Sequence, residues 1–194
     1  MWRRCAEWAG IELGSDQIDR MQRYRRWLNE EAVRAGGLGP DEPGRIDRRH
    51  IGDSILFAKC LATPELVVDF GSGAGLPGIP LAITLPAVEF LLIDRAGRRV
   101  DLLRRAARIL DLPNVQVLQG DLDTIPDRPP AIVSRATLVP QDAAARLAPR
   151  LGPGGVLVLG GSWVASPAFP GWITIEVPAS ILDHEVWLLM MRAT

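Results

Sequence analysis

The strongest constraint on the fold is a short apolar segment, residues 66–70, that is followed at once by a glycine-rich turn, residues 71–78. An apolar run of this length predicts a strand that is buried on both faces, as in a parallel sheet. Glycines directly after such a strand permit positive φ angles and let the backbone approach a ligand closely. The segment therefore predicts a nucleotide-cofactor site at the edge of an α/β sheet.

A second strand with an acid at its end supports this prediction. Residues 88–93 form another apolar run, and Asp94 follows it, 25 residues after Asp69. At the carboxyl edge of a parallel sheet, an acid in this position can accept hydrogen bonds from ribose hydroxyls. Asp94 is therefore expected to bind the ribose of the cofactor.

Two known patterns overlap in the glycine-rich turn. The spacing of Gly73, Gly75 and Gly78 fits the dinucleotide pattern G-x-G-x-x-G, so a nicotinamide enzyme is one alternative. The run that begins at Asp69 also reads D-x-G-x-G-x-G, which resembles the first motif of S-adenosylmethionine-dependent methyltransferases. Pro77 favours the second pattern, because a dinucleotide-type helix is usually under way at that position, although proline is allowed in a first helical turn.

The rest of the chain alternates between strand and helix patterns. An N-terminal helical cap, 1–63, is predicted to contain helices at 15–34 and 47–61, and the core, 64–194, to form one compact unit with it. The predicted core elements are strand 66–70, helix 78–84, strand 88–93, helix 96–111, strands 115–119 and 131–135, helix 140–149, and strands 155–160, 172–177 and 185–191. This order predicts a mostly parallel, seven-stranded Rossmann-like sheet with helices on both faces and an antiparallel pair at one edge.

Composition narrows the class of protein. A chain of 194 residues with 47% hydrophobic content can build one well-cored domain with a small appendage. No apolar run reaches the ~18 residues of a membrane helix, and residues 1–5 lack the apolar core of a signal peptide, so a cytoplasmic protein is expected. Cys5 and Cys60 are interpreted as reduced structural thiols, and the distant His50 and His184 predict no metal site.

The net charge of -1 conceals an uneven distribution of arginine. Lys59 is the only lysine among the 22 basic residues. Arginine suits RNA phosphates, but a GC-rich genome gives the same bias without a functional reason. Two clusters indicate two local basic faces, and they comprise Arg20, Arg23, Arg25 and Arg26 in one segment and Arg95, Arg98, Arg99, Arg104, Arg105 and Arg108 in another. Trp27, beside the first cluster, is a candidate base-stacking residue, with packing as the alternative.

Three motifs together resemble one family. They are R-H-x-x-D-S at 49–54, D-x-G-x-G-x-G-L-P-G at 69–78 and S-R-A at 134–136. Over roughly residues 12–190 the chain is similar to the 16S ribosomal RNA guanine-N7 methyltransferases, also called the glucose-inhibited division protein B family. The resemblance implies a bacterial cytoplasmic enzyme that uses S-adenosylmethionine and acts on 16S ribosomal RNA or the small-subunit particle. We expect a monomer without a metal or a membrane partner.

The resemblance also assigns site residues. Cofactor contacts are expected, in chain order, from Asp69, Gly71, Ser72, Gly73, Gly75, Leu76, Asp94, Leu122, Asp123 and Arg135. Within this set, Leu122 and Asp123 would frame the adenine. Arg135 would also lie where the methyl donor meets the guanine, and His50, Asp53 and Ser54 would come from the helix that covers this place. The expected catalytic residues are therefore Arg135, His50 and Asp53.

The expected chemistry asks little of the protein. Guanine N7 carries a lone pair and no proton, so methyl transfer needs positioning more than a general base. The product base is cationic, and an acid such as Asp53 near the ring could stabilise the developing charge.

Several of these residues have a structural alternative. Asp69 could hold the glycine turn rather than touch the cofactor. Arg135 could pair with a carboxylate at the sheet edge. His50 and Asp53 lie three residues apart and could bond to each other across one helix turn. His184 is interpreted as a surface or strand-end residue.

Two departures from the family pattern concern the substrate half of the site. Most members have Asn-Leu-Thr after the first long helix, where residues 31–36 read Glu-Ala-Val-Arg-Ala-Gly. Most also have Lys-Gly at the end of the fifth strand, where this chain has Gly160 and Gly161. The missing lysine leaves two alternatives open: a methyltransferase with another RNA or a small-molecule substrate, or a non-catalytic cofactor-binding paralogue.

Overall fold

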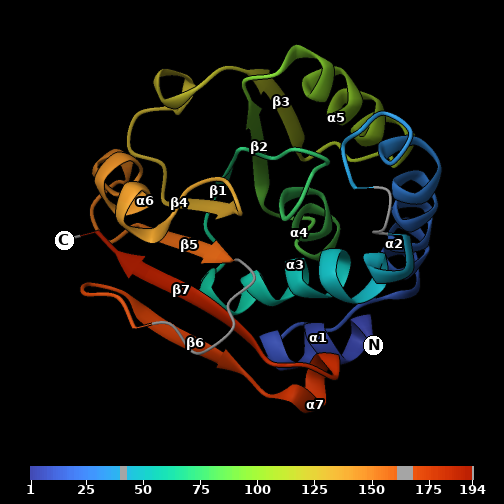
Figure 1. Ribbon diagram of the computed structural model, residues 1–194, viewed down its shortest axis with the longest axis horizontal. Helices are drawn as coiled ribbons and strands as arrows, with labels where there is room; N and C mark the ends of the chain where they lie inside the picture. The colour runs from blue at the N-terminus through green and yellow to red at the C-terminus, as the bar shows by residue number, and fades with distance from the viewer. Residues whose placement is uncertain (40–42, 161–167, 194) are drawn as a thin grey trace.

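A twisted sheet runs through the middle of the molecule, with helices on both sides (Figure 1). The computed structural model describes residues 1–39, 43–160 and 168–193. The seven strands lie in the order β3-β2-β1-β4-β5-β7-β6. They are β1 (Leu66–Phe70), β2 (Glu89–Asp94), β3 (Val115–Gln119), β4 (Ala131–Arg135), β5 (Val156–Gly160), β6 (Ile173–Val177) and β7 (Val186–Arg192). The first five are parallel, and β7 pairs antiparallel with both β5 and β6, which confirms the predicted fold class.

The helices follow the predicted order, with local differences. They are α1 (Trp2–Ala9), α2 (Ser15–Trp27), α3 (Asp53–Leu56), α4 (Gly78–Thr84), α5 (Gly97–Ile109), α6 (Pro140–Arg146) and α7 (Ala179–Leu182). The predicted helix 15–34 is α2 continued by a π-helical turn, η1 (Leu28–Ala32), and the predicted helix 47–61 is a π-helical segment, η3 (Ile46–Gly52), followed by α3 and a 3-10 turn, η4 (Phe57–Cys60). The helices α1 and α7 were not predicted, because each is short. No helix among the described residues has the length and apolarity needed to cross a membrane.

Successive residues of the central strands point to opposite faces of the sheet. Val67 belongs to a large cluster that includes side chains of α1 to α5, whereas Val68 belongs to a smaller cluster with Ala143 of α6. Tyr24 of α2 and Ile55 of α3 are in the large cluster, so the N-terminal cap and this face of the sheet share one core. Both cysteines are buried free thiols, and burial raises the pKa of each to about 11, which keeps them protonated and unreactive.

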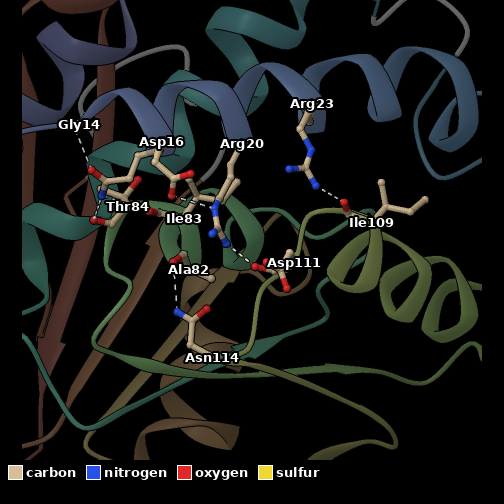
Figure 2. Close-up of polar contacts among 11 residues, drawn as sticks. Gly14, Asp16, Arg20, Arg23, Ala82, Ile83, Thr84, Ile109, Asp111 and Asn114 are labelled. Carbon is tan, nitrogen blue, oxygen red and sulfur yellow. Dashed lines mark hydrogen bonds and ion pairs between the residues drawn. The ribbon is translucent and has the colours of Figure 1, made fainter.

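The helix α2 lies across the carboxyl-terminal ends of α4 and α5 (Figure 2). The Arg20 guanidinium donates to the carbonyl of Asp111, and the Arg23 guanidinium donates to the carbonyl of Ile109. Carbonyl groups in the last turn of a helix lack partners within the helix, and a positive charge is favourable there. These two arginines therefore dock α2 onto α5.

The first arginine cluster is thus largely occupied by intramolecular contacts. Arg20 also pairs with Asp16, and Arg25 pairs with Asp47 at 2.7 Å. Trp27 is only 4% exposed and stacks on the Tyr24 ring with centroids 5.9 Å apart. The prediction of Trp27 as a base-stacking residue is wrong, and the packing alternative is confirmed.

Asn114 connects α4 to the start of β2 through its buried side-chain amide, which donates to the carbonyls of Ala82 at 3.1 Å and Val88 at 3.0 Å (Figure 2 draws the first bond). We expect Asn114→Ala to lower the free energy of unfolding by about 2 kcal/mol, because two buried carbonyls lose their donor. Equilibrium urea denaturation measures this change. Asn29→Ala removes a solvent-exposed bond to the Arg25 carbonyl and should cost much less, so equal losses for the two variants would contradict the prediction.

Candidate functional site

The glycine-rich turn begins where β1 ends and leads into α4. Gly71, Gly73 and Gly75 have φ angles of 76°, 59° and 98°, in the region that favours glycine. A Cβ atom at Gly73 would meet no atom closer than 3.9 Å, so the missing side chain leaves open space beside this part of the turn. The hydroxyl of the buried Tyr24 donates to the carbonyl of Ala74 at 3.0 Å, which ties α2 to the turn. No local pattern predicts this contact, because Tyr24 and Ala74 are 50 residues apart.

Asp69 lies fully buried beneath the turn. Its Oδ2 accepts a hydrogen bond from the backbone N–H of Gly78 at 2.9 Å, and its carbonyl accepts one from the Ser72 hydroxyl at 2.8 Å. The structural alternative for Asp69 is therefore present in the structure. Its Oδ1 is buried without a hydrogen-bond partner among the described residues, and burial raises the pKa of this carboxyl group to about 7. A direct cofactor contact through this oxygen stays a prediction.

Asp94 is 3% exposed, and both of its carboxylate oxygens are oriented by the backbone. Oδ2 accepts from the N–H of Gly73 at 3.0 Å, and Oδ1 accepts from the N–H of Ala96 at 2.9 Å. The Arg99 guanidinium lies 3.6 Å from Oδ2. Because each carboxylate oxygen can accept more than one hydrogen bond, Asp94 keeps acceptor capacity for a ligand.

A cavity of about 300 Å³ opens beside these residues, at the carboxyl ends of β1, β2 and β3. Its lining includes Gly71, Asp94, Gly120, Asp121, Thr137 and Leu138. Leu122 and Asp123, which were predicted to frame the adenine, are not part of this lining and form the turn η5 (Leu122–Thr124) just beyond it. Asp121 begins this turn by accepting from the Leu122 N–H at 2.8 Å. The role of Leu122 and Asp123 stays a prediction.

Asp121 lines the first cavity but is not among the residues predicted from the sequence, although its position in the sequence carries a signal. Asp94 ends β2, and Asp121 stands two residues after the end of β3, at the same edge of the sheet. An acid at or just after the end of a strand in this sheet is therefore a sign of a residue that lines the cavity, as Asp94 and Asp121 do.

A second cavity, of about 190 Å³, lies over the carboxyl ends of β4 and β5. Its charged and polar lining comes from Arg49, His50, Asp53 and Arg135. Ala136, with a φ angle of 54°, lines both cavities, so the two adjoin at the S-R-A motif. The structure thus brings together all three side chains that were predicted to be catalytic.

Arg135 joins the end of β4 to the segment η3. One guanidinium nitrogen donates to the carbonyl of Arg49 at 2.9 Å, and the other lies 3.0 Å from Nδ1 of His50. Ser54 is fully buried and donates to the carbonyl of His50, so it holds the helix turn and does not line the cavity. These contacts fix the orientation of Arg135 at the junction of the two cavities.

Asp53 has a partner that the sequence did not reveal. Its Oδ1 lies 3.7 Å from Nε2 of His184, a residue between α7 and β7 that was interpreted as a surface or strand-end residue. His50 contacts Arg135 instead, so the alternative of a bond between His50 and Asp53 is wrong. Burial raises the pKa of Asp53 to about 6, and Arg135, His184 and Arg49 oppose this shift. His184 could not be linked to Asp53 from local patterns, because the two lie far apart in sequence.

The packing around Gly160 matches the absence of the lysine that the family pattern has at this position. A Cβ atom at Gly160 would lie 2.4 Å from Cζ of the buried Phe57 ring, so the ring occupies the space that a side chain at this position would need. Gly161 lies outside the described residues. In residues 31–36, where the family pattern has Asn-Leu-Thr, Glu31 forms a 2.9 Å ion pair with Arg105 of α5.

The second arginine cluster lies on and before α5, where Arg95, Arg98 and Arg99 are exposed. Arg95 and Arg99 also line the first cavity. Farther along the helix, Arg104 lies 3.7 Å from Asp101, in an exposed pair. Part of the predicted second basic face is therefore found beside the cavity. Across residues 1–39, 43–160 and 168–193, no cluster of three or more His, Cys, Asp or Glu side chains could hold a metal ion.

Solved structures with the same fold include methyltransferases. The chain superposes on an S-adenosylmethionine-dependent methyltransferase from Aquifex aeolicus with a TM-score of 0.60 and 16% identity, covering 84% of this chain and 99% of that chain. A methyltransferase from Geobacter sulfurreducens gives a TM-score of 0.58 at 17% identity, with 91% and 89% of the two chains covered.

Sequence comparison identifies the relatives. Ribosomal RNA small subunit methyltransferase G of Acidothermus cellulolyticus is 36% identical over 136 residues, 70% of this chain and 61% of that protein. The protein of the same name from Enterobacter sp. is 37% identical over 135 residues, 69% of this chain and 65% of that protein. The chain thus spans less than two thirds of the length of these relatives. Residues 17–165 match the family described as rRNA small subunit methyltransferase G. With this match and with the motif-bearing residues gathered around two adjoining cavities, the chain belongs to the rRNA small subunit methyltransferase G family.

Proposed function

We propose that this protein transfers a methyl group from S-adenosylmethionine to N7 of a guanine in 16S ribosomal RNA. The observation that carries the proposal is the junction of two cavities at Ala136, beside Arg135. One cavity is lined by Asp94 and by Gly71 at the start of the glycine turn, and the other is lined by His50 and Asp53. Family membership supports the choice of ribosomal RNA over a nicotinamide-dependent reaction.

The residues of the first cavity fit the proposed cofactor. Asp94 has spare acceptor capacity for the ribose hydroxyls, and the open space at Gly73 admits a ligand close to the backbone. Asp69 is fully buried and does not line the cavity, so a direct contact through its unpartnered Oδ1 would need a change in the turn above it. The remaining expected contacts are backbone groups of the turn and of η5: Gly71, Ser72, Gly75, Leu76, Leu122 and Asp123. The bound cofactor would supply a methyl group on a positively charged sulfur.

In the proposed reaction, the lone pair of guanine N7 forms the bond to the methyl carbon. The carbon–sulfur bond breaks, and its electron pair stays on sulfur, which becomes neutral. No proton is transferred, so the side chains of this chain act by orienting the base and by stabilising its new positive charge. Arg135 and His50 are proposed to fix the approach of the base, and the Asp53 carboxylate to offset the charge.

The exposed arginines before and on α5 support an RNA partner. Arg95 and Arg99 line the first cavity, Arg98 is exposed next to Arg99 in the chain, and these arginines can neutralise phosphates that flank the target nucleotide. A ribosomal substrate implies that the protein acts in the cytoplasm, and we propose that it acts as a monomer. A small-molecule acceptor is a second candidate, because the second cavity is small and has Gly160 where the family pattern has lysine.

Labelled methyl transfer tests the proposal. The substrates are free 16S RNA and intact small subunits, both from a strain of the source organism that lacks this gene. We expect incorporation at a single guanine, with cleavage chemistry specific for N7-methylguanine mapping the site, and RNA affinity that falls steeply with salt concentration. Cofactor binding without transfer to either substrate would refute the proposal, and transfer to free guanine nucleotides alone would favour the small-molecule candidate.

A further inference from the structure

The second cavity has the size and position expected for the target base. Its volume of about 190 Å³ lies below the ~300–1,000 Å³ of sites for drug-sized ligands, which suits a single base. Phe57, Trp187 and Leu188 give it buried apolar walls. A purine base that enters this cavity would replace water at these apolar walls.

The proposed chemistry fixes how a guanine lies in this cavity, and the inference therefore rests on the proposed function. N7 must face the first cavity across the junction at Ala136. The opposite edge of the purine, which carries N1–H and the 2-amino group, then points into the second cavity. This edge presents two adjacent hydrogen-bond donors and needs acceptors.

Asp53 is the only carboxylate among the described residues that line this cavity. Its side chain is 21% exposed, and its buried Oδ1 accepts no hydrogen bond from the described residues, because Nε2 of His184 lies 3.7 Å away, beyond hydrogen-bonding distance. An ionised carboxylate is an acceptor through both oxygens, so it matches two adjacent donors. Since the Asp53 side chain lines the cavity and is part-exposed there, a donor on a bound base can reach the carboxylate and offset the cost of its burial.

We propose that Asp53 recognises the target base by accepting hydrogen bonds from N1–H and the 2-amino group of guanine. Adenine offers an acceptor at N1 and no amino group at C2, so the carboxylate disfavours it. When N7 receives the methyl group, the ring becomes positive and its N1–H becomes a stronger donor. The hydrogen bonds to Asp53 therefore strengthen in the transition state, and recognition and charge stabilisation come from the same contact.

The charges around Asp53 keep it in the acceptor form. Arg135 from β4, Arg49 from η3 and His184 before β7 all favour the ionised carboxylate, and they oppose the effect of burial. Cys5 of α1 is also close enough to interact with this charge, and its own pKa is raised to about 11, so it remains neutral. With a pKa of about 6, Asp53 is mostly ionised at neutral pH and becomes protonated as the pH falls below that value.

The test compares guanine with inosine, which lacks only the 2-amino group and keeps N7. After the target site is mapped with the wild-type protein, ligated 16S RNA that carries either base at that site is assayed for kcat/KM of methyl transfer. We expect inosine to be about tenfold poorer with the wild-type protein, and Asp53→Ala to lower the rate on guanine by about tenfold to a hundredfold, the range for hydrogen bonds to a charged group. With Asp53→Ala, guanine and inosine should react equally.

Controls separate recognition from other causes. Asp101→Asn makes a similar loss of charge at an exposed position of α5 and should change neither rate, and cofactor affinity should be unchanged in Asp53→Ala. In the wild-type protein, the rate on guanine should fall as the pH is lowered through an apparent pKa near 6, because Asp53 becomes protonated. This pH dependence should vanish in Asp53→Ala. Equal wild-type rates on guanine and inosine, or a preference or pH dependence that survives in Asp53→Ala, would overturn the inference. Failure of the proposed function differs from these results, because the wild-type protein would then methylate no guanine N7.

Discussion

Replacing Asp94 with alanine is expected to weaken the binding of S-adenosylmethionine by at least about a hundredfold. The carboxylate is held in place by the N–H groups of Gly73 and Ala96, and it faces the first cavity with acceptor capacity to spare. Two hydrogen bonds to ribose hydroxyls, each worth about 1.5–3 kcal/mol when the acceptor is charged, would be lost. Since about 1.4 kcal/mol corresponds to tenfold in affinity, a hundredfold loss is the lower bound.

Isothermal titration calorimetry with S-adenosylmethionine measures this effect. Asp101→Ala removes a carboxylate that is 81% exposed on α5 and should leave the dissociation constant unchanged. A dissociation constant for Asp94→Ala within threefold of the wild-type value would show that Asp94 serves only to hold the turn.

The second large effect is expected at Gly75, and Gly73 provides its matched comparison. A Cβ atom at Gly75 would lie 2.4 Å from Cδ1 and 2.8 Å from Cγ1 of the buried Ile79, whereas at Gly73 the nearest atom is 3.9 Å away. Both glycines have positive φ angles, which cost an alanine roughly 1–2 kcal/mol. Gly75→Ala adds overpacking, roughly 1–3 kcal/mol more, so it should lower the free energy of unfolding by about 2–5 kcal/mol.

The two substitutions should separate stability from binding. Gly73→Ala should cost only the φ strain in urea denaturation, but its methyl group enters the space that the cofactor needs and should weaken cofactor binding. Gly75→Ala should be the less stable of the two. Equal losses of stability would mean that Ile79 moves aside easily, and the packing argument would then be wrong.

The fold and the cofactor half of the site could be predicted because their signals are local. Strand β1, the glycine turn and Asp94 follow one another within a short stretch of the chain. The apolar patterns of the later segments identify them as alternating strands and helices, which predicts a mostly parallel sheet. The contacts of Asp53 with His184, and of Tyr24 with Ala74, join distant segments and leave no local trace. Such pairs depend on how the elements pack.

Arginine was the least predictable residue type. Arg20 and Arg23 have the charge and shape to bind phosphate, yet they dock α2 onto the carbonyl groups of α5 (Figure 2). Arg95 and Arg99, with the same side chain, are exposed and line the cavity. A guanidinium group donates equally well to a helix end and to a phosphate, so composition and clustering do not distinguish the two uses.

The contact between Gly160 and the Phe57 ring has a consequence for how this site can evolve. At 2.4 Å from the ring, even the first carbon of a lysine side chain at position 160 has no room while phenylalanine occupies position 57. A lysine at position 160 therefore requires that the ring at position 57 moves or is replaced by a smaller side chain. The effects of substitutions at positions 57 and 160 are therefore expected to depend on each other, and Gly160→Lys should be tolerated better together with a smaller residue at position 57 than alone.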